Sequence, residues 1–534
     1  MKKYLLILLV IICSSAVQAQ LSGIKTVGAG KDYATLTAAI TALNAGGSVG
    51  PGGVTFNVDA DYTESTTAQL AITITGTAGN EIIFQKSGVG ANPKITRTDA
   101  GSNSTSTLGG LGDGVIRLDG TDYITFDGID VAASASTIEY GYYLHKPTAT
   151  NGCQQVTIKN SAVTMTKGTS AYVVGIYVGN GASTVSSATG VTVSANSGRN
   201  ENITITGNTI SNVHAGIVCR GYSAAAYYDQ NIVIGASGAG NGNTIQNFGG
   251  GSATTTYGIY FIYTNNTSVE YNTINNAGGG GSAHASTFYS VFFSTVTGSV
   301  ACNNNAFTLN TSGTSSVYGI YQGNGTNVTT QDYNNNTFSG STATTTTSYL
   351  IYASNTTANA KNIIGNSISG SFTKTGASGT FYCFYDFGSP TGVATISDNN
   401  FSNISLTGTS TFYGINLNTT ATHTQNVYNN TLSNITSGSG TSYGISLASA
   451  NTRSVYGNTI GDFSGAGTVY GIYISSGGNT TNDFYKNKIY NLSSSSTLTT
   501  AGLVTGIYFG TLGTAVTGNN VYNNIIGNLT ATAA

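Results

Sequence analysis

The chain repeats two short words along most of its 534 residues. The first is a four-residue word whose clearest form, YGIY, stands at 257–260, with relatives that begin at 174, 215, 289, 318, 349, 382, 413, 443, 470 and 505. The second is Asn, a variable residue and an apolar residue, at Asn208, Asn243, Asn272, Asn305, Asn336, Asn366, Asn399, Asn430, Asn458, Asn487 and Asn524. The two words alternate at a spacing of roughly 30 residues, a period typical of solenoids and other repeat folds.

The composition of each repeat indicates strands. Apolar residues do not recur at helical spacing, and short runs of β-branched and aromatic residues are separated by Gly, Asn and Ser. About thirty residues supply three short strands and three turns, which is one coil of a parallel β-helix. Each strand then pairs in parallel with its equivalent in the next coil, so the same residue is needed at the same corner. We therefore predict an all-β solenoid over residues 51–534, with about fifteen coils and a length of about 70 Å.

The Asn word predicts a corner of each coil. A sharp corner needs a residue that tolerates the left-handed backbone conformation, and Asn does so better than other residues with a side chain. Stacked from coil to coil, the amides can hydrogen-bond along the axis as a ladder. We interpret these asparagines as structural rather than as glycan-attachment or metal-binding residues.

The YGIY word predicts a row of aromatic side chains. Its third position is always apolar and is expected to point into the core; by strand alternation the first position shares that face, while the second and fourth face outward. The fourth position then forms an outer stripe that could stack against sugar rings. A purely structural ladder is the alternative, because stacked rings also stabilise a sheet. The candidate carbohydrate-binding residues are Tyr177, Tyr260, Tyr321, Tyr352, Tyr385, Tyr473 and Tyr508.

The N-terminus is typical of an export signal. Two lysines precede an apolar run and small residues that end in VQA, which predicts a signal peptide at 1–19 with cleavage after Ala19. The apolar run is too short to span a membrane, and no later segment qualifies. We expect a secreted or cell-surface protein without a membrane span.

The two ends of the repeat region differ. Residues 33–45 have the pattern of an amphipathic helix, with Asp32 as the expected N-cap and Gly46 and Gly47 as the stop. We assign 20–50 as an N-terminal cap whose helix covers the first coil and its open strand edge. The chain stops at Ala534 just after a fresh coil, so we expect it to be truncated or to continue into a further C-terminal domain.

Charge and cysteine content exclude several functions. Only 7% of residues are charged and the formal net charge is −2, so no basic field exists to attract nucleic acid. The cysteines of the mature chain stand singly, which excludes the paired spacing of zinc and redox motifs. We expect them in the core, with a disulfide left open; they are Cys153, Cys219, Cys302 and Cys383.

Three N-terminal stretches resemble a known group. The segments KTVGAGKDYATLTAAITALNAGG (25–47), GGVTFNV (52–58) and VIRLDGTDYITFDGIDV (115–131) are similar to the opening of secreted right-handed parallel β-helix proteins of the pectin-lyase-like superfamily, especially those of Bacteroidetes-type bacteria. The resemblance implies a single-stranded right-handed parallel β-helix over nearly the whole mature chain. It also implies that any enzymatic activity would be that of a lyase or hydrolase of uronate-containing polysaccharides.

Acidic residues concentrate in one stretch, at Asp113, Asp119, Asp122, Asp127 and Asp130, with Arg97 and Arg117 nearby. If the chain were an enzyme, Asp127, Asp130 and Arg117 would be the catalytic candidates, and Asp119 and Asp122 would be the candidate Ca²⁺ ligands. The alternative is that these aspartates occupy turns between strands. The hydrolases' paired-aspartate, Gly-His-Gly and Arg-x-Lys words are absent, as is the pectate lyases' Arg-x-Pro-x-x-Arg.

The remaining titratable residues are dispersed. His145, His214, His284 and His423 stand alone, and we expect them at turns or on the surface. The sequence therefore favours an exported, non-enzymatic scaffold, a surface adhesin or carbohydrate-binding protein whose partner is a polysaccharide or cell-surface glycan. The alternative is a polysaccharide lyase or glycoside hydrolase with its site in the N-terminal coils. We expect no cofactor, and Ca²⁺ would be needed only by the lyase alternative.

Overall fold

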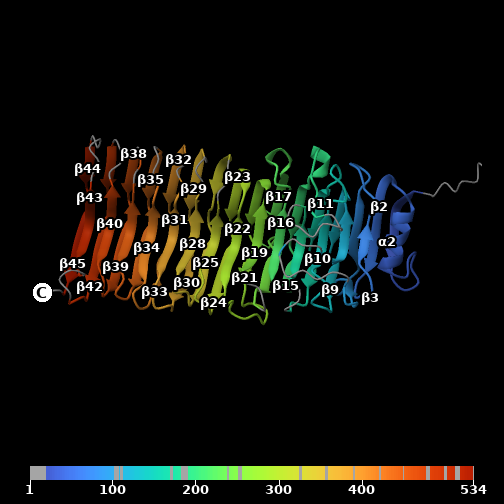
Figure 1. Cartoon of the computed structure of the whole chain (residues 1–534), viewed down its shortest axis with the longest axis horizontal. Helices are drawn as coiled ribbons and strands as arrows, with labels where there is room; N and C mark the ends of the chain where they lie inside the picture. The colour runs from blue at the N-terminus through green and yellow to red at the C-terminus, as the bar shows by residue number, and fades with distance from the viewer. Residues whose placement is uncertain are drawn as a thin grey trace, which may run out of the picture.

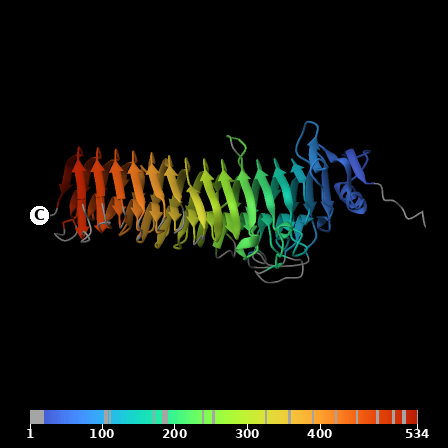
Figure 2. The ribbon, with the colours of Figure 1, turned by 90° about the horizontal axis from the view of Figure 1, so that it is seen from above.

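The computed structural model describes residues 20–101, 108, 112–168, 172–181, 190–236, 238, 240–250, 255–323, 327–354, 359–388, 391–419, 423–448, 450, 452–476, 481–497, 502–511 and 518–532. The expected signal peptide at 1–19 lies outside these residues. The described chain forms one elongated stack of coils with its N-terminal helix at one end and the last strands at the other (Figure 1). Seen from above, the strands of successive coils lie side by side along the whole stack (Figure 2).

Three parallel sheets, here called A, B and C, run the length of the molecule. Sheet A consists of β1 (Leu21–Val27), β2 (Val49–Asp59), β5 (Ile82–Ser87), β8 (Ile124–Asp127), β11 (Gln154–Lys159), β14 (Glu201–Thr206), β17 (Asp229–Gly235), β20 (Thr264–Glu270), β23 (Val296–Asn303), β26 (Val328–Asp332), β29 (Ala360–Ile364), β32 (Val393–Ser397), β35 (Thr424–Tyr428), β38 (Thr452–Tyr456), β41 (Thr481–Tyr485) and β44 (Gly518–Tyr522). Sheet B consists of β3 (Thr63–Thr66), β6 (Lys94–Arg97), β9 (Asp130–Ala133), β12 (Ala162–Thr164), β15 (Thr209–Val213), β18 (Thr244–Phe248), β21 (Thr273–Asn275), β24 (Ala306–Thr311), β27 (Thr337–Thr342), β30 (Ser367–Lys374), β33 (Ile404–Leu406), β36 (Thr431–Thr436), β39 (Thr459–Gly465), β42 (Lys488–Ser494) and β45 (Ile525–Ala531). Sheet C consists of β4 (Leu70–Ile72), β7 (Gly114–Asp119), β10 (Tyr140–His145), β13 (Val174–Val178), β16 (Ala215–Arg220), β19 (Thr255–Ile262), β22 (Thr287–Phe293), β25 (Val317–Gln322), β28 (Thr347–Ala353), β31 (Thr380–Asp386), β34 (Thr411–Leu417), β37 (Ser442–Leu447), β40 (Val469–Ser476) and β43 (Val504–Thr511).

The coil order confirms the predicted fold class. One strand of A, one of B and one of C follow each other along the chain, and each pairs in parallel with the equivalent strand of the next coil. The protein is an all-β, right-handed parallel β-solenoid with very little helix. The two short 3-10 turns, η1 (Asn196–Gly198) and η2 (Ala225–Tyr227), lie between coils in the N-terminal half.

The core is a column of stacked side chains enclosed by the three sheets. Equivalent residues of successive coils lie above one another, as in the row Phe56, Phe84 and Phe126, whose ring centroids are 4.6 and 5.2 Å apart. The described cysteines are buried and free, and no two of them form a disulfide. Burying an apolar row in every coil supplies the main stabilisation of such a stack.

The asparagine ladder is confirmed, and it closes the corner between sheets A and B. From Asn208 to Asn487 each ladder asparagine donates hydrogen bonds from its backbone N–H and from Nδ2 to Oδ1 of the next ladder asparagine. Nδ2 also donates to a carbonyl of the preceding coil, as from Asn336 to Cys302 at 2.8 Å. One amide thus ties three coils together.

The backbone prediction for these asparagines was wrong by one residue. None of the ladder asparagines has a positive φ; the residue before each of them does in every coil from Tyr271 to Asn523, including Asn304 and Asn335. The preceding residue makes the turn, which places the ladder side chain inside the corner, where Asn336 is fully buried. Burial explains why an amide is required, since its donors and acceptor must all be satisfied there.

Within the part of the chain that the structure describes there is one α-helix, α2 (Leu36–Ala45), and it covers the first coil. Its apolar side packs on β1, β2 and β4, and the residues it buries are Leu36, Ala39, Ile40 and Leu43. The expected cap, Asp32, was wrong: the Thr35 side chain accepts a hydrogen bond from the Ala38 N–H, whereas Asp32 accepts from Thr26. Within the described residues, no helix has the length and apolar character needed to cross a membrane.

Candidate functional site

The YGIY word lies on sheet C and does not alternate as predicted. Its second and third positions both point inward: Gly319 stands next to Ile320, which is fully buried, and the second-position residues Leu350 and Cys383 are also fully buried. The first and fourth positions both point outward. The prediction that the first position faces the core was therefore wrong, because two consecutive inward residues interrupt the regular alternation of the strand.

Glycine in the second position of the word permits two consecutive residues to face the core. A Cβ built on Gly319 would lie 2.4 Å from the Leu350 carbonyl oxygen and 2.8 Å from the Phe338 ring. A Cβ on Gly444 would lie 2.8 Å from Ile460. At these coils only a residue without a side chain fits between the strand and the neighbouring sheet B.

The outer surface of sheet C consequently carries two aromatic rows instead of one. Row one contains the first-position residues Tyr257, Tyr289, Tyr318, Tyr349, Tyr382, Tyr413, Tyr443 and Tyr470. Row two contains the fourth-position residues Tyr260, Phe292, Tyr321, Tyr352, Tyr385, Tyr473 and Tyr508. We call the two rows together the aromatic face. Sequence reasoning missed row one, although the Tyr in the first position of the word recurs more regularly than the fourth.

The rings of row one form a continuous ladder. From Tyr257 to Tyr470 their centroids are 4.5 to 5.4 Å apart and their planes are within 5 to 14° of each other. Rings that stack directly face to face have their centroids closer together than this. The stacking is therefore offset, and each ring leaves part of its face uncovered. The ladder therefore stabilises the sheet and presents aromatic surface at the same time.

Row two lies at a changing angle to row one. Tyr260 is nearly parallel to Tyr257, at 19°, whereas Tyr321 is inclined by 69° to Tyr318 and Tyr352 by 87° to Tyr349. From β25 onward the two rows thus form a herringbone surface. Edge-to-face contacts between the rows fix the ring orientations.

The predicted stripe residues differ in accessibility. Tyr260, Tyr321, Tyr352, Tyr385 and Tyr473 are half-buried, and Tyr508 is 38% exposed. Tyr177, by contrast, is 1% exposed, because it packs in a separate buried cluster with Tyr140, Tyr143, Tyr172, Val174, Ala215 and Val218. Tyr177 therefore lies outside the accessible part of the stripe, which begins at Tyr260.

The aromatic face is electrically neutral. The strands of sheet C from β19 to β43 contain one charged residue, Asp386, and it is fully buried inside the solenoid beside Lys361. Burial raises the pKa of Tyr382 and of Tyr413 to about 12, so these hydroxyls stay protonated at physiological pH. The face offers ring surface and neutral hydroxyl groups, but no charge.

The acidic stretch does not form one site. Arg117 donates to Asp119 at 2.7 Å on sheet C, and His145 Nδ1 lies 2.8 Å from the other Asp119 oxygen. Although burial alone would raise it, the hydrogen bonds from His145 and Arg117 hold the pKa of Asp119 below its ordinary value. Asp122 accepts from the Gln154 N–H at 2.7 Å, and burial raises its pKa. The predicted Ca²⁺ ligands are thus engaged with different protein groups.

The catalytic candidates also separate. Asp127 ends β8 on sheet A, where it accepts a hydrogen bond from Asn160 and lies 3.1 Å from Lys159 Nζ. Asp130 begins β9 on sheet B and accepts from Asn92 and from the Ala162 N–H. Arg117 belongs to sheet C and does not join them. Among the described residues no group of three or more His, Cys, Asp or Glu side chains could hold a metal ion.

The histidines were expected at turns or on the surface; His214 lies at a bend between β15 and β16, but none of the four is at the surface. His145, His214, His284 and His423 are all at most 3% exposed. His214 and His284 each accept a backbone hydrogen bond at Nδ1, from Val173 and Gly250. Burial lowers both pKa values to about 4, so both rings are neutral at physiological pH.

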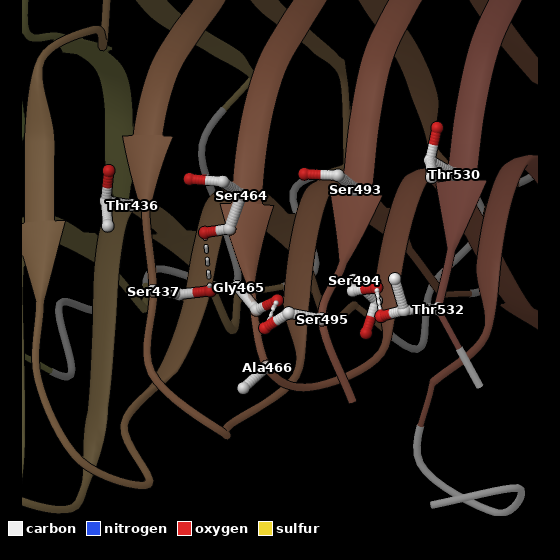
Figure 3. Close-up of a pocket in the computed structure, with 10 residues that line it drawn as sticks. All are labelled: Thr436, Ser437, Ser464, Gly465, Ala466, Ser493, Ser494, Ser495, Thr530 and Thr532. Carbon is white, nitrogen blue, oxygen red and sulfur yellow. Dashed lines mark hydrogen bonds between the residues drawn. The ribbon is translucent and has the colours of Figure 1, made fainter. Parts of the chain in front are cut away.

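Two open hollows lie away from the aromatic face. The first, of about 310 Å³, is lined by Gln85, Lys86, Gly88, Asn92, Asp127, Gly128 and Asn160. The second, of about 370 Å³, lies at the C-terminal coils and is lined by Thr436, Ser437, Ser464, Gly465, Ala466, Ser493, Ser494, Ser495, Thr530 and Thr532 (Figure 3). Several of its hydroxyls are used between coils, as from Thr532 to the Ser494 carbonyl at 2.8 Å. With only Ser, Thr, Gly and Ala, its lining contains no acid or base.

Comparison with known proteins identifies no family. No protein-family model and no curated protein matches the chain. Among solved structures the chain is similar to a GH136 lacto-N-biosidase from Eubacterium ramulus, with 12% identity over 78% of this chain and 64% of that chain and a TM-score of 0.39. It is also similar to a mannuronic-acid-specific family 6 polysaccharide lyase from the human gut microbiota (9% identity, 85% and 84% coverage, TM-score 0.28) and to PfbA, a surface adhesin of Streptococcus pneumoniae (10%, 82% and 88%, TM-score 0.31). The chain spans less than two thirds of the length of that biosidase.

Proposed function

We propose that the protein is an exported, non-enzymatic β-solenoid that binds carbohydrate along the aromatic face of sheet C. The observation that carries this proposal is the pair of aromatic rows, which place partly exposed rings in coil after coil of one sheet. Aromatic rings stack against the apolar faces of sugars, and tyrosine adds a hydroxyl that hydrogen-bonds. The N-terminal leader supports a secreted or surface location, where glycans are the available partners.

The repeat distance supports a polymeric ligand. Ring centroids recur every 4.5 to 5.4 Å along row one, a distance close to the length of one sugar unit in an extended chain. A polysaccharide lying along the axis would therefore meet a similar pair of rings at each unit. Many weak and equivalent contacts of this kind would together give a higher affinity than any one contact alone.

The proposal is tested with the double variant Tyr321→Ala, Tyr352→Ala. Its affinity for immobilised polysaccharide in native gels should fall by about thirtyfold, because each of the two stacking contacts contributes on the order of 1 kcal/mol. The matched control is Tyr456→Ala, Tyr485→Ala, which removes two rings from a separate stacked row on sheet A. Equal retention of both variants and the wild type on every bound polysaccharide would refute the aromatic face as the ligand surface.

A second candidate function is supported by the hollow at Asp127. This carboxylate and the Lys159 amine are 3.1 Å apart and both partly exposed, and Lys86 and three amides line the same hollow as Asp127. A carboxylate beside amines is the type of arrangement with which a polysaccharide lyase or glycoside hydrolase could hold and protonate its substrate. Release of reducing ends from acidic or neutral polysaccharides, with or without Ca²⁺, that is lost in Asp127→Ala would establish this activity.

A further inference from the structure

Row two of the aromatic face is interrupted at two consecutive coils. In register, Tyr385 pairs with Asn416, Asn416 with Ser446, and Ser446 with Tyr473. Row one continues past the same coils, with Tyr413 and Tyr443 stacked at 4.5 Å. Polar side chains thus replace rings at two positions in an otherwise aromatic row, and we call these two positions the row-two gap.

The two polar residues of the gap are mostly buried, and their side chains have no hydrogen-bond partner among the described residues. Asn416 and Ser446 are each 8% exposed, although they occupy outward-facing positions of the strands. Their polar atoms remain accessible from outside, unlike fully buried atoms without a partner such as Ser290 Oγ. An amide and a hydroxyl at adjacent coils are therefore accessible and free to hydrogen-bond a ligand.

The edges of the gap are held in place. At one side the Asn418 amide lies 3.3 Å from the Tyr385 hydroxyl and orients it. At the other side Tyr473 packs edge-to-face on Tyr443, with centroids 5.1 Å apart and planes at 68°. From Tyr385 to Tyr473 is three coil steps, about 14 Å at one strand spacing per coil. That length accommodates a short stretch of a sugar chain between two aromatic walls.

We propose that the row-two gap is the subsite at which the aromatic face hydrogen-bonds the hydroxyl groups of an uncharged glycan. An amide and a hydroxyl both donate and accept, which matches sugar hydroxyls in either role. An acidic sugar is disfavoured because the strands around the gap carry no outward cation to replace the water around its carboxylate. This inference rests on the proposed carbohydrate-binding function and adds to it a ligand class and a polar anchor.

The test measures binding of two ligand series to residues 20–534 by titration calorimetry. One series is neutral, with cello-, manno- and xylo-oligosaccharides, and the other is acidic, with oligogalacturonate and oligomannuronate. We expect binding in the neutral series, and we expect Asn416→Ala, Ser446→Ala to weaken it by about tenfold through the loss of the polar contacts. The matched control is Asn426→Ala, which removes an outward amide from β35 of sheet A, the strand that follows the strand of Asn416.

A second variant tests the row-two gap by filling it instead of by removing its polar groups. Asn416→Tyr, Ser446→Tyr would complete row two and extend a ladder that the sheet already tolerates in neighbouring coils. It should fold with an unchanged circular dichroism spectrum and still lose neutral-glycan binding, because the new rings fill the subsite. This variant separates loss of the subsite from loss of folding.

The outcomes distinguish this inference from the function on which it rests. Neutral-glycan binding that weakens in both gap variants and persists in Asn426→Ala would support the subsite. Binding that is lost in Tyr321→Ala, Tyr352→Ala but unaffected by both gap variants would overturn the subsite and leave the aromatic face as the ligand surface. Preference for the acidic series would overturn the ligand class, and absence of binding in both series would overturn the subsite together with the proposed function.

Discussion

The side-chain oxygen of Asn336 accepts two hydrogen bonds from Asn305, from the backbone N–H at 3.0 Å and from Nδ2 at 3.1 Å. Asn336 itself donates to the next ladder residue and to the preceding coil. Asn336→Ala should therefore lower the free energy of unfolding by about 3 kcal/mol, since several buried groups lose their partners at once. Denaturant titration followed by circular dichroism measures this loss.

The adjacent residue provides the control. Asn335 is exposed and has φ 56°, so Asn335→Gly keeps the turn and should change stability by less than about 0.5 kcal/mol. If the two substitutions destabilised the protein equally, the exposed Asn335 side chain would contribute as much as the buried amide, and the ladder would not be the main stabilisation of the corner.

Gly319→Ala tests the inward second position of the YGIY word. The added Cβ would meet the Leu350 carbonyl oxygen and the Phe338 ring at distances that require the strands to move apart. We expect a loss of about 2 to 3 kcal/mol, measured by denaturant titration. Gly518→Ala is the matched change, because nothing lies within 4 Å of its added Cβ; a comparable loss there would contradict the steric explanation.

The solenoid and its asparagine ladder could be predicted because both depend on repetition. A residue such as Asn336, present once per coil, reports its role through its spacing before any coordinates are known. The direction of the YGIY side chains could not be predicted from alternation, because Gly319 and Ile320 both face the core and shift Tyr318 outward. A period of two cannot indicate a place where two consecutive residues of a strand face the core.

The sequence also could not predict which residues of the aromatic face are accessible. Tyr177 has the same place in its word as Tyr321, but in the N-terminal coils Tyr140, Tyr143 and other residues pack around it. Covering by segments distant in sequence leaves no local pattern. The gap at Asn416 and Ser446 was visible as a departure from the repeat, yet its meaning depended on the absence of partners within the described residues.

The buried ion pair between Lys361 and Asp386 makes a further prediction. The two charged atoms are 2.6 Å apart and both side chains are fully buried. Asp386→Ala leaves an unpaired ammonium in the core and should destabilise the protein by about 3 to 5 kcal/mol. Lys361→Met, Asp386→Leu removes both charges and should cost much less, because the next coil has Ala394 and Leu417 at the same places. Urea titrations of both variants measure the difference; a double variant as unstable as the single one would show that the pair itself stabilises the fold.

Two of the four buried imidazoles, His214 and His284, predict how stability depends on pH. Burial lowers the pKa of His214 and of His284 to about 4, from about 6.5 for an exposed imidazole. Between these values the unfolded chain binds protons that the folded chain does not, so stability is fully present above pH 6.5 and falls as the pH is lowered toward 4. We expect a loss of about 2 kcal/mol for each imidazole over this range.

His214→Asn, His284→Asn keeps a side-chain acceptor for the Val173 and Gly250 N–H groups and removes the titration. Thermal unfolding at pH 7.5 and pH 4.5 should then show a smaller difference for the variant than for the wild type, and an identical difference would mean that other groups carry the acid sensitivity.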